Sequence, residues 1–296
     1  MIALMDIVSQ TLPPLIPGIG GALITTFQTL GTIMSFQNEV NPSTRTQYSK
    51  FAATAASSST DTIIKGTKEE ETKKKKKQLV SSETGMTIIY APAFFVSTFI
   101  LLGDSSLVAF LPNPTLACVL CTIHFAKRVC EVKFLHKYSG TVELAVSSFI
   151  GTYYALISIL ICSVATPTPS ATSVWIGTSL FSIGVVGNLY HHYLLANLRS
   201  SNSGGNSGTT TDSSSSKRYI TPKGGLFEFV AAPHYLFELI GWLGLAIVAE
   251  HVNAFLVFTS MSSYLAGRAV SQNRWNREKF QDEWSNDKKN LIPFLF

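Results

Sequence analysis

The stretch VELAVSSFIGTYYALISILICSV, residues 142–164, contains one acidic residue, Glu143, and no Lys or Arg. An α-helix rises about 1.5 Å per residue, so this stretch can cross the roughly 30 Å hydrocarbon core of a bilayer. The chain of 296 residues is 14% charged, whereas soluble domains are about 25% charged. Because the deficit lies in long apolar runs, the sequence predicts an all-α, multi-pass membrane protein.

Six further apolar stretches are long enough for helical spans, which predicts a polytopic bundle of about seven transmembrane helices. The seven predicted spans are residues 12–35, 86–102, 105–124, 142–164, 172–196, 225–249 and 252–267. Pro112 and Pro114 interrupt the third span, which predicts a kinked helix there. The first span begins near Asp6 with no preceding basic residue, so we expect it to be retained rather than cleaved as a signal peptide.

All 23 Lys and Arg residues lie after the first, third, fifth and seventh predicted spans. Positive residues accumulate in cytosolic loops. This one-sided pattern therefore predicts a lumenal N-terminus and a cytosolic C-terminus, and it explains the net charge of +5 without a nucleic-acid partner. The bilayer itself is the expected partner.

Two segments, residues 53–85 and 200–216, have low-complexity composition and predict flexible cytosolic loops. We therefore expect residues 1–85 to form a first transmembrane helix with a cytosolic loop. Residues 86–296 are expected to form the main membrane domain.

Polar residues form stripes near the cytosolic ends of three predicted helices. Asn188, His192 and Arg199 share one helical face, and His234 and Glu238 are spaced i, i+4. A third stripe contains His124, Lys127, Arg128 and Glu131. Ionisable groups inside a membrane are costly and mark candidate sites. Interhelical hydrogen bonding is the simpler explanation of one stripe, but three stripes with arginines favour an anionic ligand.

Several other sites are disfavoured by the sequence. Cys118 and Cys121 form a CxxC with no second pair, so helix packing is a better interpretation than a metal or redox site. The six histidines are too few and too scattered for a di-iron hydroxylase, so we expect no metal. No GxGxxG follows a strand, which excludes a Rossmann dinucleotide site.

Short motifs resemble the C-terminal domain of the steroid 5α-reductase family. They are residues 224–230 (GGLFEFV), 233–238 (PHYLFE), 241–244 (GWLG) and 291–296 (LIPFLF), with Asn188, Leu198-Arg199 and Tyr219 in matching order. The resemblance covers roughly residues 86–296. It implies an NADPH-dependent reductase, in the endoplasmic reticulum membrane, of a carbon–carbon double bond conjugated to a carbonyl.

The very-long-chain trans-2-enoyl-CoA reductase branch of that family is the most similar. Residues 124–128 (HFAKR), Glu131 and residues 134–139 (FLHKYS) resemble its HxxKR…E…FxHxxS pattern. The resemblance implies that Lys127, Arg128 and Tyr235 are catalytic. It also implies a set of NADPH-binding residues, namely Asn188, His192, Arg199, Tyr219, His234, Glu238, Arg268 and Arg274.

The sequence departs from the family at three places. The steroid branch has a Gln-Glu pair in its second span, whereas residues 88–92 (IIYAP) contain no acid. The enoyl branch opens with a ubiquitin-like domain, where this chain has a span. After the last span the family shows His-Arg and a Tyr, where this chain has Asn273-Arg274 and Asn276.

The substrate class stays open at this point. An acyl-CoA of fatty acid elongation is favoured, with the other elongation enzymes as partners, and a 3-oxo-Δ4-steroid or a polyprenal are alternatives. A membrane S-adenosylmethionine-dependent methyltransferase of isoprenylcysteine or phospholipid type is the main competitor from another class. Those enzymes carry Arg-His-Pro-x-Tyr where this chain has Ala231-Ala232-Pro233-His234-Tyr235.

Overall fold

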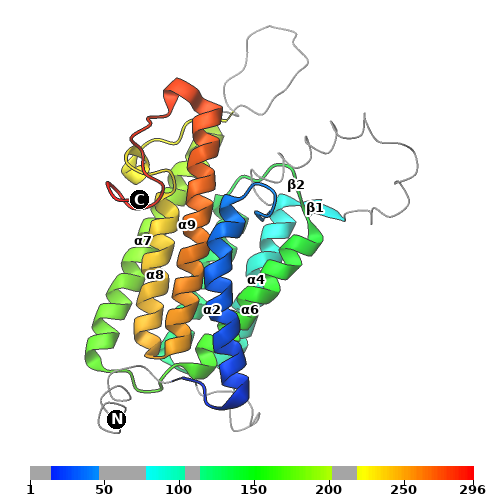
Figure 1. Ribbon diagram of the computed structural model, residues 1–296. Helices are drawn as coiled ribbons and strands as arrows, with labels where there is room; N and C mark the ends of the chain where they lie inside the picture. Colours follow the sequence, from blue (N-terminus) through cyan, green and yellow to red (C-terminus); the bar gives the residue numbers. More distant parts are fainter. Residues whose placement is uncertain (1–14, 47–77, 104–113, 202–218) are drawn as a thin grey trace. The chain divides into compact units, whose positions relative to one another are not determined.

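The computed structural model describes residues 15–46, 78–103, 114–201 and 219–296, without the side chains of 199–201. The described residues form seven α-helices (Figure 1). They are α2 (Gly18–Val40), α4 (Ser82–Leu102), α5 (Leu116–Cys130), α6 (Leu144–Val164), α7 (Ala171–Ser201), α8 (Pro233–Ala249) and α9 (Val252–Phe280). The predicted helical class is confirmed, apart from two strands of three residues each, and each helix overlaps one predicted span. The low-complexity segments lie mostly outside the described residues.

Four helices, α2, α4, α6 and α7, are long and apolar enough to cross a membrane by length and composition. Helix α8 is apolar but shorter, with 17 residues. Helix α5 has 15 residues, and α9 has 29 with charges towards its end. The predicted membrane nature is therefore supported by four candidate spans among the described residues, and the full count of seven spans stays a prediction.

Three helix boundaries differ from the predicted spans by eight residues or more. Helix α5 begins at Leu116 because the Thr115 hydroxyl accepts the Cys118 amide at 3.2 Å and caps it. Helix α8 begins at Pro233, since proline is favoured in a first helical turn; residues Gly225–Glu228 form a separate 3₁₀ turn. Helix α9 continues to Phe280, because helical backbone hydrogen bonds form with polar residues as well as with apolar ones.

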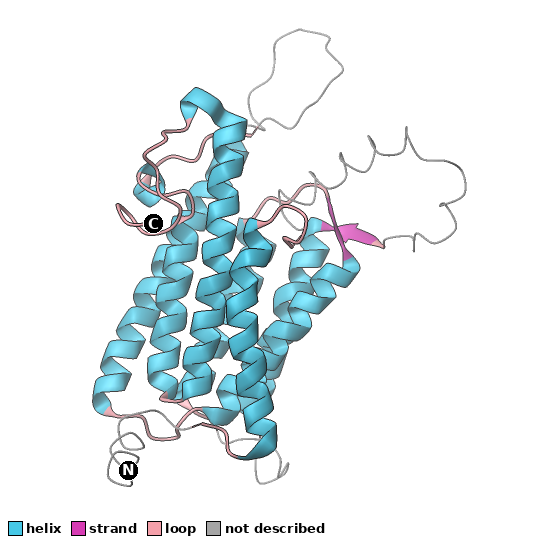
Figure 2. Cartoon of the chain, viewed as in Figure 1, coloured by secondary structure: helices cyan, strands magenta, loops and turns pink. Residues whose placement is uncertain are grey.

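The chain divides into two compact units. The first contains α2, α7, α8 and α9 with residues 135–137, and the second contains α4, α5 and most of α6. In the second unit, strands β1 (Leu79–Ser81) and β2 (Thr141–Glu143) pair antiparallel, with Val80 opposite Val142 (Figure 2). A π-helical turn, Glu131–Leu135, follows α5.

Glycines let α7 and α8 pack closely in the first unit (Figure 1). A Cβ atom on Gly184 would lie 2.3 Å from the Gly241 amide nitrogen, and one on Gly244 would lie 2.4 Å from the Gly177 carbonyl oxygen. Backbones can therefore approach to a distance that any larger residue would prevent. Small residues at helix contacts are typical of membrane proteins.

Helices α2 and α9 are joined by polar side chains instead. The Thr32 and Ser260 hydroxyls lie 2.6 Å apart, and Ser35 donates to Ser263 at 2.9 Å. Further along, a guanidinium nitrogen of Arg268 lies 3.2 Å from the Glu39 carboxylate, and both side chains are 2% exposed. Such interhelical hydrogen bonds hold helices together where no hydrophobic driving force exists.

The CxxC residues of α5 lie in the second unit. The Cys118 thiol donates to the Ser97 carbonyl at 3.6 Å, and the Cys121 thiol donates to the Ser158 hydroxyl at 3.7 Å. Both cysteines are buried, and neither forms a disulfide. They contact α4 and α6, which confirms the packing role expected from the sequence.

Candidate functional site

The polar stripes of α7 and α8 meet inside the first unit. The Asn188 side-chain amide donates to the His234 carbonyl at 2.8 Å and to the Glu238 carboxylate at 3.1 Å. Asn188 is 2% exposed and His234 is 6% exposed. Two of the three predicted stripes thus form one buried polar cluster in apolar surroundings. The convergence of the third stripe stays a prediction.

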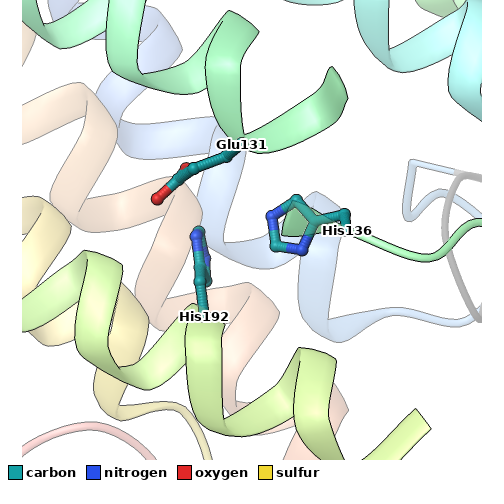
Figure 3. A group of neighbouring side chains, drawn as sticks. All are labelled: Glu131, His136 and His192. Carbon is teal, nitrogen blue, oxygen red and sulfur yellow. The ribbon is translucent and has the colours of Figure 1, made fainter. Parts of the chain in front are cut away.

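Imidazole rings extend this cluster. The rings of His136 and His192 lie 4.8 Å apart in a T-shaped arrangement (Figure 3). The His192 ring lies 5.3 Å from that of His234, which in turn lies 4.2 Å from the Tyr235 ring. His136 comes from the residues after the π-helical turn, so segments distant in sequence contribute to one group. Tyr235, in the first turn of α8, is half-buried beside it.

His191, which precedes His192 on α7, contacts the segment that follows the glycine pair 224–225. Its Nδ1 lies 2.7 Å from the Gly187 carbonyl, and its Nε2 accepts the Leu226 amide at 3.2 Å. These two partners place the proton on Nδ1. Gly225 has φ +54°, and a Cβ there would lie 2.9 Å from His191 Nε2. Only glycine fits this turn, which explains the GG motif.

Tyr219 lines a groove of about 330 Å³ together with Lys223 and Lys279. The Lys279 ammonium lies 5.8 Å from the centre of the Tyr219 ring, and that ring makes a T-shaped contact with Trp275 at 4.8 Å. Two cationic side chains and an aromatic face suit a phosphorylated, planar group. The groove is also lined by the Glu283 carboxylate, which accepts from the Thr221 hydroxyl at 2.9 Å. The Gly224 amide nearby donates to the Glu228 carboxylate at 2.7 Å.

Lys127 and Arg128 form a charged cluster in the second unit. Lys127 Nζ lies 2.9 Å and an Arg128 nitrogen 2.6 Å from the two carboxylate oxygens of Glu131. The other terminal nitrogen of Arg128 lies 2.5 Å from the Tyr90 hydroxyl. Glu131 is 3% exposed and Arg128 is 8% exposed. One carboxylate therefore holds both cations in place, and it reduces their combined charge.

The remaining candidate arginines lie elsewhere. Arg268 is bound to Glu39, and Arg274 donates to the Val40 carbonyl at 3.3 Å. Both tie α9 to the end of α2. The side chain of Arg199 lies outside the described residues.

Three residues of the first and second units were not singled out by the sequence. Tyr90 belongs to an apolar helix, and its hydroxyl accepts a hydrogen bond from Arg128, which is distant in sequence. Lys288 and Trp284 follow α9 in a segment that looks like a charged surface tail, yet both are buried.

Comparison with known proteins gives the family. The sequence profile of the family described as 3-oxo-5-alpha-steroid 4-dehydrogenase matches residues 135–296. The chain is 29% identical over 209 residues to a very-long-chain enoyl-CoA reductase of Dictyostelium discoideum, which covers 69% of this chain and 65% of the relative. It is 37% identical over 123 residues to 3-oxo-5-alpha-steroid 4-dehydrogenase 1 of Macaca fascicularis, covering 41% of each.

A steroid 5-alpha-reductase of Solanum lycopersicum is 31% identical over 121 residues, 41% of this chain and 42% of the relative. The chain thus spans less than two thirds of the length of these curated relatives. The family profile nevertheless matches more than half of the 296 residues, including the α7 and α8 cluster and the glycine pair. The chain belongs to the 3-oxo-5-alpha-steroid 4-dehydrogenase family.

Proposed function

We propose that this protein is an NADPH-dependent reductase of a carbon–carbon double bond conjugated to a carbonyl on a lipid substrate. The observation that carries the proposal is a polar cluster on two helices of largely apolar composition. In it, Asn188, His192 and His234 are buried and Tyr235 and Glu238 are half-buried. Such a cluster is costly in a membrane unless it serves a ligand or a reaction. The family membership supplies the reaction class.

Residues of the first unit have the chemistry that NADPH requires. The groove beside Tyr219 offers Lys223 and Lys279 for phosphate. We propose that NADPH is held by the set inferred from the resemblance, namely Asn188, His192, Arg199, Tyr219, His234, Glu238, Arg268 and Arg274. When bound, it supplies the hydride for the β-carbon of the substrate.

The protein's own residues then have two tasks. Negative charge develops on the carbonyl oxygen, and a donor must meet it there. The α-carbon then needs a proton from a positioned acid. We assign the proton to the Tyr235 phenol, and we assign Lys127 and Arg128 to stabilising the negative charge, as the family resemblance implies.

Among substrates, 2-enoyl-CoA is favoured and a 3-oxo-Δ4-steroid comes next. The similarity to the Dictyostelium enoyl-CoA reductase extends over 209 residues, whereas that to the Macaca steroid enzyme extends over 123. We further propose the endoplasmic reticulum membrane as the location, a lumenal N-terminus, and residues 86–296 as the reductase domain. Enzymes of fatty acid elongation are the proposed partners.

A membrane S-adenosylmethionine-dependent methyltransferase is the alternative, and the cofactor distinguishes the two. Purified protein in detergent is heated with NADPH, NADH or S-adenosylmethionine while its unfolding is followed. We expect NADPH to raise the midpoint, because a ligand that binds the native state stabilises it. Stabilisation by S-adenosylmethionine and not by NADPH would falsify the proposal.

The substrate is tested in membranes. Microsomes that contain the protein receive NADPH with a 2-enoyl-CoA, a polyprenal or a 3-oxo-Δ4-steroid in parallel, and each saturated product is measured. We expect the enoyl-CoA to be reduced fastest. Microsomes with the Tyr235→Phe variant serve as the control for endogenous reductases.

A further inference from the structure

Lys288 is buried although it belongs to a polar segment after α9. Its side chain is 9% exposed, and its Nζ donates to the Phe227 carbonyl at 2.7 Å. The ammonium also lies 4.4 Å from the centre of the Trp284 ring, within cation–π distance. Burial lowers the pKa of Lys288; Glu228 opposes this shift, and Lys223 adds to it. A buried charge costs free energy unless it is well paired, so this arrangement needs a reason.

The residues around Lys288 form a closed set of contacts. Trp284, 2% exposed, donates its indole N–H to the Asn273 side chain at 2.8 Å. The Asn273 amide group donates to the Lys288 carbonyl at 3.1 Å and to the Asn290 side chain at 2.9 Å. Asn273 belongs to α9, so this helix fixes both ends of the segment Trp284–Asn290, termed the strap.

The strap is hydrogen-bonded to the segment that leads into α8. Val230 and Lys289 form a parallel bridge. The Ala231 amide donates to the Lys289 carbonyl at 2.9 Å, the Lys289 amide to the Phe229 carbonyl at 2.9 Å, and the Ala232 amide to the Asn290 carbonyl at 3.2 Å. Residues Phe227–Ala232, termed the approach segment, are therefore held along most of their length.

The approach segment ends one residue before α8. Its Ala232 carbonyl accepts the Tyr235 amide at 3.0 Å in the first turn of that helix. A displacement of Ala232 would therefore move the backbone of Tyr235. Asn188 holds the same turn from α7 through the His234 carbonyl. The first turn of α8 is thus fixed from two sides, by α7 and by the strap.

We propose that Lys288 is a positioning residue, which fixes the approach segment through the Phe227 carbonyl and so holds Tyr235 in place for the reaction. An apolar side chain of similar length would fill the space without the cost of a buried ammonium. Such a side chain has no hydrogen-bond donor, so it could not hold the Phe227 carbonyl in one position. This inference rests on the proposed function, because Tyr235 gives the position its importance.

The first experiment measures hydrogen exchange in the full-length protein and does not depend on activity. Lys288→Met removes the donor while keeping the length of the side chain. We expect the amides of Ala231, Ala232 and Lys289 to exchange about tenfold faster, with those in the second half of α8 unchanged. Lys288→Arg, which keeps a cationic donor, should restore protection, and Lys289→Met, whose side chain is exposed, should change nothing.

The second experiment separates turnover from cofactor binding. Lys288→Met should lower kcat by about tenfold to a hundredfold while the KM for NADPH changes less than about twofold, because misplacement affects the reaction more than the binding. Lys288→Arg should recover most of kcat. Unchanged exchange at the three amides, or equally faster exchange throughout α8, would overturn the inference. So would an unchanged kcat.

The two proposals fail in distinguishable ways. A wild-type protein without reductase activity on any substrate contradicts the proposed function, and it removes the catalytic reason for the strap. Loss of local protection in Lys288→Met would even then show that the strap holds the approach segment. Full activity with loss of protection contradicts only the positioning role.

Discussion

Tyr235 combines a position beside the His234 ring, with 4.2 Å between ring centres, with a place in the first turn of α8. Tyr235→Phe removes one hydroxyl and keeps the ring. If the phenol delivers the proton, turnover should fall by about a hundredfold to ten-thousandfold, which is the range for loss of a general acid. The NADPH-dependent rise in unfolding midpoint should persist.

The control for this variant is Tyr193→Phe, on an exposed face of α7, which should leave turnover unchanged. Retained full activity in Tyr235→Phe would remove this residue from the mechanism. It would leave the reductase assignment itself intact.

His251 gives the protein a pH-dependent stability. Burial lowers its pKa below the ordinary value of 6.5, and its Nδ1 caps α9 by accepting the Asn253 amide at 3.2 Å. The native state therefore binds fewer protons than the unfolded state. Stability should be complete above pH 6.5 and should fall as the pH drops below it.

Thermal unfolding in detergent between pH 8 and about pH 5 checks this expectation. His251→Asn keeps a capping acceptor but does not titrate, so its midpoint should be flatter across the same window. Glu250 affects the pH dependence of stability only at lower pH. Desolvation would raise its pKa, but hydrogen bonds from Ser173 and Ser170 hold the pKa below its ordinary 4.5. An identical slope in wild type and His251→Asn would contradict this role of His251.

At the scale of elements, the contact between α7 and α8 depends on Gly184. A Cβ there would lie 2.3 Å from a backbone nitrogen of Gly241, whereas a Cβ on Gly241 would meet nothing closer than 3.9 Å. Gly184→Ala should therefore destabilise the protein by about 1–3 kcal/mol, the usual cost of overpacking. Gly241→Ala, at the same contact, should be tolerated.

The unfolding midpoints of both variants in detergent measure the difference. Because the α7–α8 contact also positions Asn188 against His234, Gly184→Ala should lose NADPH stabilisation as well. Equal midpoints for the two alanine variants would show that the helices can separate without cost.

The ion pair of Glu39 and Arg268 links α2 to α9 and has no contact with bulk solvent, since both residues are 2% exposed. Glu39→Leu would leave a buried cation without its carboxylate, at a cost of about 3–5 kcal/mol. The double variant Glu39→Leu, Arg268→Leu should recover most of that stability.

The same pair tests the proposed role of Arg268 towards NADPH. If the residue also meets the cofactor, the double variant should unfold near the wild-type midpoint and yet show weaker stabilisation by NADPH. Full NADPH stabilisation in the double variant would assign Arg268 to the α2–α9 contact alone.

At the scale of the whole molecule, the charge distribution predicts that the two chain ends lie on opposite sides of the membrane. Helices of 15 and 17 residues, α5 and α8, are about 22 and 26 Å long at 1.5 Å per residue, somewhat less than a bilayer core. The crossing number is therefore worth measuring directly. A glycosylation acceptor added before residue 1 should be modified, and one inserted within 202–218 should not. Modification of both sites would place them on the same side of the membrane and would contradict an odd number of crossings between them.

Much of this architecture follows from sequence alone. Apolar length predicted every helix, since burying backbone in lipid requires helices wherever apolar runs are long enough. The i, i+4 spacing of His234 and Glu238 predicted a shared face, and the structure places Asn188 against that face. The packing of Cys118 and Cys121 was also predictable, because residues three apart lie on the same face of a helix.

Other features were decided only by tertiary structure. The partner of Arg268 is 229 residues away, and Tyr90 meets Arg128 across 38 residues. Lys288 looked like one more cytosolic charge, yet Trp284 and Asn273 bury it against the approach segment. Asn273, which departs from the family's histidine, serves that contact. Periodicity and composition describe one helix at a time, whereas the choice of partner depends on how separate helices pack. The sequence therefore determined the helices and the polar face of α8, and the tertiary structure determined which polar side chains pair with that face and which charges hold the helices together.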